Sequence, residues 1–165
     1  DMTAGSLGNG LSIGVGMALS ARLHRQDYYT YVMMGDGEIQ EGMVWEAAMA
    51  AAHHRLDNLV AMVDVNGIQI NGWVNDIMRV EPLADKWRAF GWNVVECDGH
   101  DMRSVLVAFH KARAKRGAPT VILAATVKGK GVSYMEDNNL WHGQAPNDAQ
   151  TEEAIREINQ AEEGL

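Results

Sequence analysis

Two polar residues, Asp36 and Asn66, each follow an apolar run, and they stand thirty positions apart. Asp36 offers a carboxylate oxygen and Asn66 an amide oxygen, and the backbone carbonyl of Ile68 follows two residues later. Oxygen donors of this kind suit a hard divalent cation such as Mg²⁺. They would leave about half of its roughly six coordination positions free for phosphate oxygens and water. The spacing therefore predicts a metal-and-phosphate site, provided that the fold brings the two turns together.

The segments around these turns predict a β–α–β unit. Residues 28–34 and 59–65 are strand-like apolar runs, and residues 38–55 carry apolar side chains at helical spacing. A helical crossover of this kind implies two parallel strands, and ligands of parallel sheets gather beyond the carboxyl ends of the strands. Both turns should therefore meet at one edge of a sheet. The helix expected after Gly37 would direct its N-terminal N–H groups towards the phosphate.

The rest of the chain predicts a continuation of the same α/β pattern. The glycine-rich residues 2–11 open a helix that Ser6 could cap, and Gly14 and Gly16 inside that helix indicate close approach of another backbone. Asp101 is expected to cap a further helix. The remaining expected elements are strands 92–97 and 119–126, helices 84–90, 102–116 and 148–160, and a long ordered loop over 135–146.

Composition narrows the classes of function. The chain has 165 residues, a net charge of −8 and 47% hydrophobic residues, which is enough for one domain with a real core. The acidic balance gives no basic footprint for a nucleic acid. No apolar run reaches the roughly twenty residues that a membrane span needs, and no signal peptide opens the sequence. Cys97 is the single cysteine, expected to be an inert thiol. These features predict a cytoplasmic protein with neither a membrane nor a nucleic-acid partner.

Two segments of the chain resemble a known family. The sequence GDGEIQEG, followed by DVNGIQINGW, resembles the diphosphate-binding motif of thiamine-diphosphate enzymes, and it looks most like the transketolase branch. The TVKGKGV segment at residues 126–132 and the WHGQAPND ending of the loop are also similar to that family. A phosphate-binding P-loop is excluded for TVKGKGV because the spacing G-x-x-x-x-G-K-[ST] is absent. The resemblance implies the family's diphosphate-binding (PP) fold, a mostly parallel sheet with helices on both faces, with its N-terminal part missing here and residues 1–165 forming one domain.

The resemblance also implies roles for individual residues. Mg²⁺, or Ca²⁺ or Mn²⁺ in its place, would be held by Asp36, Asn66 and the Ile68 carbonyl. His142 would be catalytic, because a loop histidine that titrates near neutrality can transfer a proton or bond a diphosphate oxygen. The residues assigned to the cofactor are Gly5, Ser6, Leu7, Gly35, Asp36, Gly37, Glu38, Asn66, Ile68 and His142.

The implied activity is transfer of a two-carbon ketol unit from a ketose, or its phosphate, to an aldose. In this family the pyrimidine end of the cofactor is held by a second domain, so the chain is expected to act only with a separate pyrimidine-binding subunit, as a heterotetramer. Three alternatives stay open: a deoxyxylulose-phosphate synthase, the E1α subunit of a 2-oxo acid dehydrogenase, and a non-catalytic assembly or regulatory domain of the same fold. The sequence does not disclose the sugar.

Overall fold

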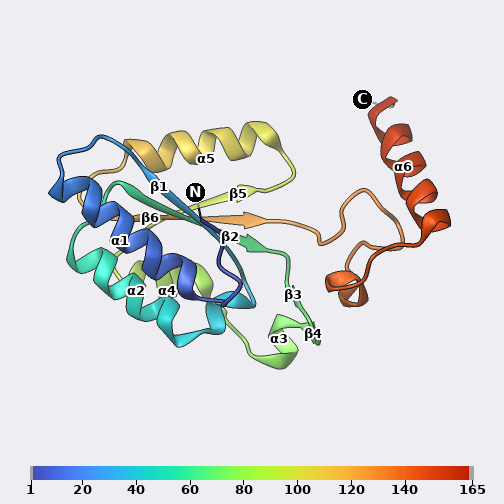
Figure 1. Cartoon of the computed structure of the whole chain (residues 1–165), viewed down its shortest axis with the longest axis horizontal. Coiled ribbons are helices and arrows are strands. Elements are labelled where there is room, and N and C mark those ends of the chain that lie inside the picture. Colours follow the sequence, from blue (N-terminus) through green and yellow to red (C-terminus); the bar gives the residue numbers. More distant parts are fainter. Residues whose placement is uncertain (1, 164–165) are drawn as a thin grey trace.

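The computed structural model describes residues 2–163 and has a four-stranded parallel sheet at its centre (Figure 1). The strand order is β1-β2-β6-β5, and every neighbouring pair runs parallel. The predicted mostly parallel α/β fold is therefore confirmed. The strands of this sheet are β1 (Thr30–Gly35), β2 (Leu59–Val65), β5 (Asn93–Asp98) and β6 (Thr120–Ala125).

Helices cover both faces of this sheet, as the resemblance implied. Figure 1 shows α5 on one face and α1, α2 and α4 on the other. Parallel strands are normally buried in this way, and β6 has five consecutive buried residues. The helices of these two layers are α1 (Asn9–Leu23), α2 (Gly42–His53), α4 (Leu83–Ala89) and α5 (Met102–Ala114).

The register of the sheet brings the strand ends into line. Gly35 of β1 is paired with Asp64 of β2, and Asp64 is paired with Ala124 of β6. Ala124 in turn is paired with Cys97 of β5. All four strands thus end at nearly the same level, and the turns that follow them share one edge of the sheet, which we call the carboxyl edge.

Small residues let α1 pack closely on the sheet. A side chain at Gly14 would collide with Val32 of β1, so the close approach predicted there is present, but it is to side chains of the sheet and not to another backbone. For Gly16 the prediction is wrong, because a Cβ at that position would meet nothing within 4 Å. The predicted Ser6 cap is also wrong. The residue before the helix is Gly8 with φ 83°, a backbone conformation that favours glycine, and no side chain caps the helix.

The predicted helix over 38–55 is divided in two. A short 3₁₀ turn, η1 (Glu38–Gln40), follows the Gly35–Gly37 turn, then Glu41 is extended, and α2 begins only at Gly42. A helix does start directly after Gly37, but it is the 3₁₀ turn η1, so the expectation of one continuous helix over 38–55 is wrong: the extended backbone of Glu41 interrupts it. The Glu38 side chain accepts hydrogen bonds from the backbone N–H groups of Gly8 and Gly35.

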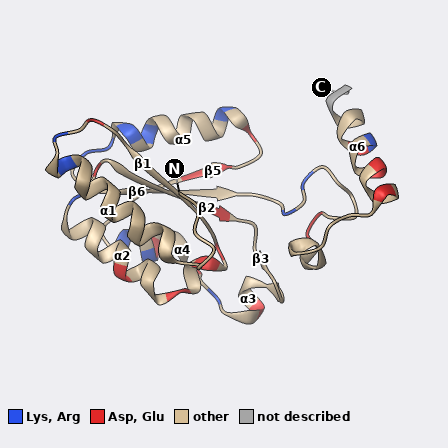
Figure 2. Cartoon of the chain, viewed as in Figure 1, with Lys and Arg blue, Asp and Glu red and all other residues tan. Residues whose placement is uncertain are grey.

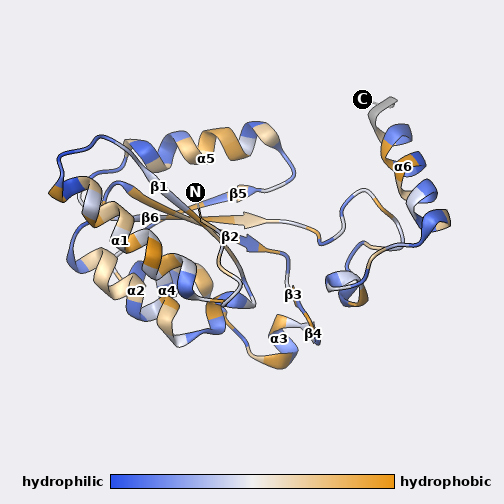
Figure 3. Cartoon of the chain, viewed as in Figure 1, coloured by the Kyte–Doolittle hydropathy of each residue, from blue (hydrophilic) through white to orange (hydrophobic). Residues whose placement is uncertain are grey.

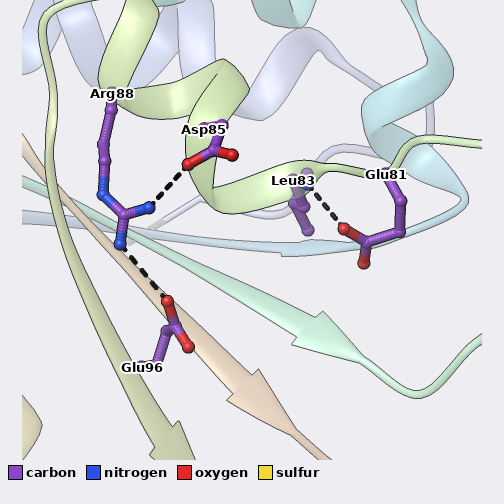
Figure 4. Close-up of polar contacts among 5 residues, drawn as sticks. All are labelled: Glu81, Leu83, Asp85, Arg88 and Glu96. Atoms are coloured by element: carbon purple, nitrogen blue, oxygen red, sulfur yellow. Dashed lines mark hydrogen bonds and ion pairs between the residues drawn. The ribbon is translucent and has the colours of Figure 1, made fainter.

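Polar contacts connect α4 to β5, the last strand in the sheet order (Figure 4). Arg88 of α4 reaches Asp85 at 2.8 Å and Glu96 of β5 at 3.4 Å. Glu81 accepts a hydrogen bond from the N–H of Leu83, the first residue of the helix. On the other face, the predicted cap of α5 is confirmed, because the Asp101 carboxylate accepts a hydrogen bond from the N–H of Arg103.

Beyond β6 the chain leaves the sheet and ends in an acidic helix (Figures 1 and 2). Residues 127–138 form turns, and the predicted loop contains a short 3₁₀ helix, η2 (Asn139–His142), before α6 (Asp148–Glu163). Figure 3 shows hydrophobic and hydrophilic residues alternating along α6, and Ile155 and Ile158 are among its exposed apolar residues. No helix in the described residues is long and apolar enough to cross a membrane.

The sequence patterns missed a small hairpin after β2. Strands β3 (Ile68–Gln69) and β4 (Gly72–Trp73) pair antiparallel and lead into the one-turn helix α3 (Val74–Ile77). Strands of two residues are too short to show a periodicity, which explains the omission. The hairpin matters because it begins with Ile68, one of the predicted metal ligands.

Candidate functional site

Asp36 lies where β1 meets the carboxyl edge, and its side chain is almost fully buried, at 2% exposure. Its carboxylate accepts hydrogen bonds from the backbone N–H of Gly37 at 2.8 Å and of Gly67 at 2.6 Å. Burial raises the pKa of the Asp36 carboxyl, and the negative charge of Asp64 adds to the rise, while the two N–H donors oppose it. A carboxylate that is buried without a cation is costly, so this site favours a bound positive ion.

The turn after β2 brings Asn66 to the same place. The Gly67 N–H that bonds Asp36 belongs to the residue after Asn66, so the two predicted turns are in direct contact. The Asn66 amide oxygen accepts a hydrogen bond from the N–H of Ile68 at 2.9 Å. An amide oxygen has two lone pairs, so one remains for a cation. Asp36, Asn66 and Ile68 are therefore neighbours on the carboxyl edge.

Two residues of this cluster were missed by the sequence reasoning. Asp64, the penultimate residue of β2, accepts a hydrogen bond from the Asn66 side-chain amide at 3.2 Å. The Thr126 hydroxyl, directly after β6, donates to the other oxygen of the same carboxylate. Asp64 could have been suspected because it stands two residues before Asn66, at a strand end. Thr126 could not, since only the sheet order places β6 beside β2.

Glu38 links the turn after β1 to the N-terminal segment. One carboxylate oxygen accepts the N–H of Gly8 at 2.9 Å, and the other accepts the N–H of Gly35 at 3.1 Å. Both oxygens are thus engaged by the protein itself. Gly5, Ser6 and Leu7 precede this anchor, and all three are exposed. The structure therefore brings the N-terminal segment to the Gly35–Gly37 turn through Glu38.

Gly37 is required by the hairpin after β2. A Cβ on Gly37 would lie 2.9 Å from the Cβ of Gln69, which is closer than real Cβ atoms approach. Glycine at this position thus allows the turn after β1 and strand β3 to lie against each other. Because β3 carries Ile68, this close contact also helps to place the third predicted metal ligand.

His142 lies at the end of η2 and is exposed. No hydrogen bond within the described residues joins it to Asp36 or Asn66. Its segment is nevertheless held close to the hairpin, since the Asn139 side-chain amide donates to the carbonyl of Ile70 at 3.1 Å. Trp141 packs on Tyr134 with a ring separation of 5.1 Å. The structure therefore places His142 on a segment attached to the β3–β4 hairpin, with no hydrogen bond to Asp36 or Asn66 within the described residues.

The donor set at the carboxyl edge fits a magnesium ion that shares its coordination with a diphosphate. Within residues 2–163, no ion pair joins Asp36 or Asp64 to a lysine or arginine. The same range contains no cluster of three His, Cys, Asp or Glu side chains arranged to hold a metal. Residues 2–163 therefore contain no metal site made only of charged side chains. The carboxyl edge instead offers one carboxylate oxygen, from Asp36, one amide oxygen, from Asn66, and one carbonyl oxygen, from Ile68. Mg²⁺ usually keeps positions open for phosphates at sites of this type.

The family follows from a comparison with known protein domains. Residues 1–161 match the family model described as the transketolase thiamine-diphosphate-binding domain. This chain belongs to that family. A solved transketolase from Campylobacter jejuni superposes on the domain with a TM-score of 0.89 at 30% identity, over 94% of this chain and 26% of that one. The fold, the family and a thiamine-diphosphate-binding domain are thus established together.

Curated relatives of this transketolase domain include separate subunits. The chain is 46% identical over its full length to one subunit of the apulose-4-phosphate transketolase of Phocaeicola vulgatus, and covers 59% of that protein. It is 44% identical over 158 residues to the 6-deoxy-6-sulfo-D-fructose transketolase subunit SqwG of a Clostridium species, covering 96% of this chain and 58% of that protein. The chain therefore spans somewhat under three fifths of the length of these relatives.

Proposed function

We propose that this chain is the diphosphate- and metal-binding subunit of a two-component transketolase, which moves a two-carbon ketol unit from a ketose or its phosphate to an aldose acceptor. The observation that carries the proposal is the contact between Asp36 and the Asn66–Gly67 turn at the carboxyl edge. The names of the relatives, two of which are transketolase subunits, favour this activity over that of a deoxyxylulose-phosphate synthase or a 2-oxo acid dehydrogenase. The two named relatives act on different sugars, so the donor sugar is left unspecified.

In this proposal the chain's own residues bind and orient. Asp36, Asn66 and the Ile68 carbonyl hold Mg²⁺, and through it the diphosphate. Residues Gly5 to Leu7, anchored by Glu38 through Gly8, would contact the thiamine, and an apolar leucine there would exclude water. His142 donates a hydrogen bond to a diphosphate oxygen or a sugar hydroxyl, or takes a proton from it. When bound, thiamine diphosphate supplies the carbanion chemistry that cleaves and forms the carbon–carbon bond.

The proposal includes a partner. A pyrimidine-binding subunit on a separate polypeptide would complete the site, and two copies of each chain would form a heterotetramer in the cytoplasm. Residues 1–165 would act as the single diphosphate-binding domain of that assembly. The exposed Gly5–Leu7 segment and the exposed His142 support this view, because both lie on surfaces that a second subunit could cover.

The test is calorimetric titration of thiamine diphosphate in the presence of Mg²⁺, with this chain alone and with the polypeptide encoded beside it that supplies the pyrimidine half. We expect cofactor binding that requires Mg²⁺, and ketol transfer only when both chains are present. Transfer by this chain alone would disprove the two-component proposal. Absence of binding with and without the partner would instead support a non-catalytic assembly domain.

A further inference from the structure

Asp64 is an acidic residue at the carboxyl edge that is not one of the proposed metal ligands. It is half-buried at the end of β2, next to Asp36 of the neighbouring strand. Its own backbone carbonyl accepts the N–H of Asp36 at 3.1 Å. Its carboxylate accepts two further bonds, from the Asn66 side chain and from the Thr126 hydroxyl. A second negative charge beside a buried carboxylate is unfavourable, so Asp64 needs an explanation.

The hydrogen bonds of Asn66 admit only one orientation of its amide. A carboxylate oxygen is an acceptor, so Asp64 must face the NH₂ group of Asn66. The backbone N–H of Ile68 is a donor only, so it must face the amide oxygen. A flipped amide would oppose oxygen to oxygen on one side and N–H to N–H on the other. Asp64 and the Ile68 N–H together therefore fix the oxygen of Asn66, and not its nitrogen, on the side of the Ile68 turn.

Thr126 holds Asp64 in the position that this role requires. Its hydroxyl donates to one oxygen of the Asp64 carboxylate, which leaves the other oxygen for Asn66. Its backbone N–H donates to the carbonyl of Val65 at 3.2 Å, so the end of β6 is fastened to the end of β2. The pairing of β2 with β6 thus produces a series of contacts across the ends of two strands, from Thr126 through Asp64 to Asn66.

We propose that Asp64 and Thr126 are positioning residues that present the Asn66 amide oxygen to the divalent cation. This inference rests on the proposed function, because it assumes that Asn66 is a metal ligand. Neither residue touches the cofactor in this proposal. Groups that hold a metal ligand in its binding orientation typically change metal affinity by about 10- to 100-fold when they are removed.

The test uses Asp64→Asn and Thr126→Val, with the partner subunit present. The Asn side chain can offer either a donor or an acceptor to Asn66, so the amide loses its fixed orientation. The Val side chain keeps the shape of Thr126 and loses only the hydroxyl. We expect the Mg²⁺ concentration for half-maximal thiamine-diphosphate binding to rise about 10- to 100-fold for Asp64→Asn and about 10-fold for Thr126→Val. Excess Mg²⁺ should restore cofactor binding in both.

Matched controls separate this role from a general effect on the fold. Asp98 is the last residue of β5, which pairs with β6 and not with β2, and it also accepts a backbone N–H, from His100. Because no hydrogen bond within the described residues joins Asp98 to Asn66, Asp98→Asn should leave the Mg²⁺ dependence unchanged. Thr151→Val on α6 controls for loss of a threonine hydroxyl. For Thr126→Val, the melting temperature without Mg²⁺ should stay close to that of the wild type. If Asp64→Asn does not fold, Thr126→Val alone still tests the proposal.

The outcomes distinguish the two proposals. If the wild-type complex binds thiamine diphosphate without any need for Mg²⁺, the metal site and this inference both fall. If the wild type requires Mg²⁺ but Thr126→Val and Asp64→Asn bind with the same Mg²⁺ dependence, only the positioning role is wrong. An equal loss in Asp98→Asn would likewise overturn it, because the effect would then be a general one of strand-end charge.

Discussion

The carboxyl edge near β1 and β2 differs sharply from the C-terminal arm formed by residues 127–163. At the edge, the buried Asp36 carboxylate accepts two backbone N–H bonds, and the Asp64 carboxylate accepts a bond from the Asn66 side chain. The arm is held mainly by exposed polar contacts, such as those between Ser133 and Glu157. The residues of the proposed metal site thus contact one another within this chain, whereas His142 lies on an exposed segment. Substitutions in the two regions should therefore have effects of different kind and size.

Asp36→Asn should have the largest effect. The change removes the only charged ligand of the proposed metal set. We therefore expect Mg²⁺-dependent binding of thiamine diphosphate to weaken by more than about 100-fold, which exceeds the effect expected for residues such as Asp64 that only position a ligand. The melting temperature without ligand should fall only modestly, because loss of the buried charge offsets the cost of an NH₂ group that faces one of the two backbone N–H donors. Calorimetry and thermal denaturation, with and without Mg²⁺, measure the two effects. Binding at wild-type strength would contradict the assignment.

His142→Ala tests the arm. Loss of a group that transfers or donates a proton should lower kcat/KM for ketol transfer by about 100-fold or more in the complex with the partner subunit. Because His142 is exposed, the melting temperature of the chain should be unchanged. His110→Ala on α5 is a matched control that should leave kcat/KM unaltered. If His142→Ala also keeps full activity, the catalytic role is wrong.

Gly8→Ala tests how tightly the N-terminal segment is held to the edge. Gly8 has φ 83°, and a Cβ would lie 2.8 Å from the Cβ of Glu41, so we expect destabilisation of about 1–3 kcal/mol. Gly16→Ala, in the same helix but with open space around it, should instead stabilise the protein by about 0.5–1 kcal/mol. Chemical denaturation of both variants measures the contrast. A destabilised Gly16→Ala would show that the helix is packed differently.

Glu157→Gln should have the smallest effect, confined to the arm. The hydrogen bonds from the Ser133 hydroxyl and N–H lower the pKa of Glu157 in the folded protein. A lowered pKa means that this stabilisation is fully present above the ordinary pKa and is lost as the pH falls through the lowered value. The protection of residues 148–161 from hydrogen exchange, relative to the intrinsic exchange rate at each pH, should therefore decrease in acid, and at neutral pH in the variant. Unchanged exchange in both cases would contradict the docking role of this contact.

The sequence predicted the sheet and the positions of the two turns well because both depend on short-range patterns. Apolar runs bounded by glycine, aspartate or asparagine gave the four main strands to within two residues, and Asp36 and Asn66 stand at their ends. It failed where a side chain acted across the fold. The Glu38 carboxylate accepts the N–H of Gly8, thirty positions away, and no local propensity reveals that contact. The roles assigned to individual cofactor residues stay predictions.

By itself, the sequence determined the alternation of strands and helices, the parallel pairing, and the two oxygen-bearing turns at the ends of adjacent strands. The reason is that periodicity and turn residues act within a few positions of the chain. Only the tertiary structure decided that β6 lies beside β2, and therefore that Thr126 reaches Asp64 and Asp64 orients Asn66. Contacts between residues some sixty positions apart depend on the order of strands in the sheet, which no local pattern encodes.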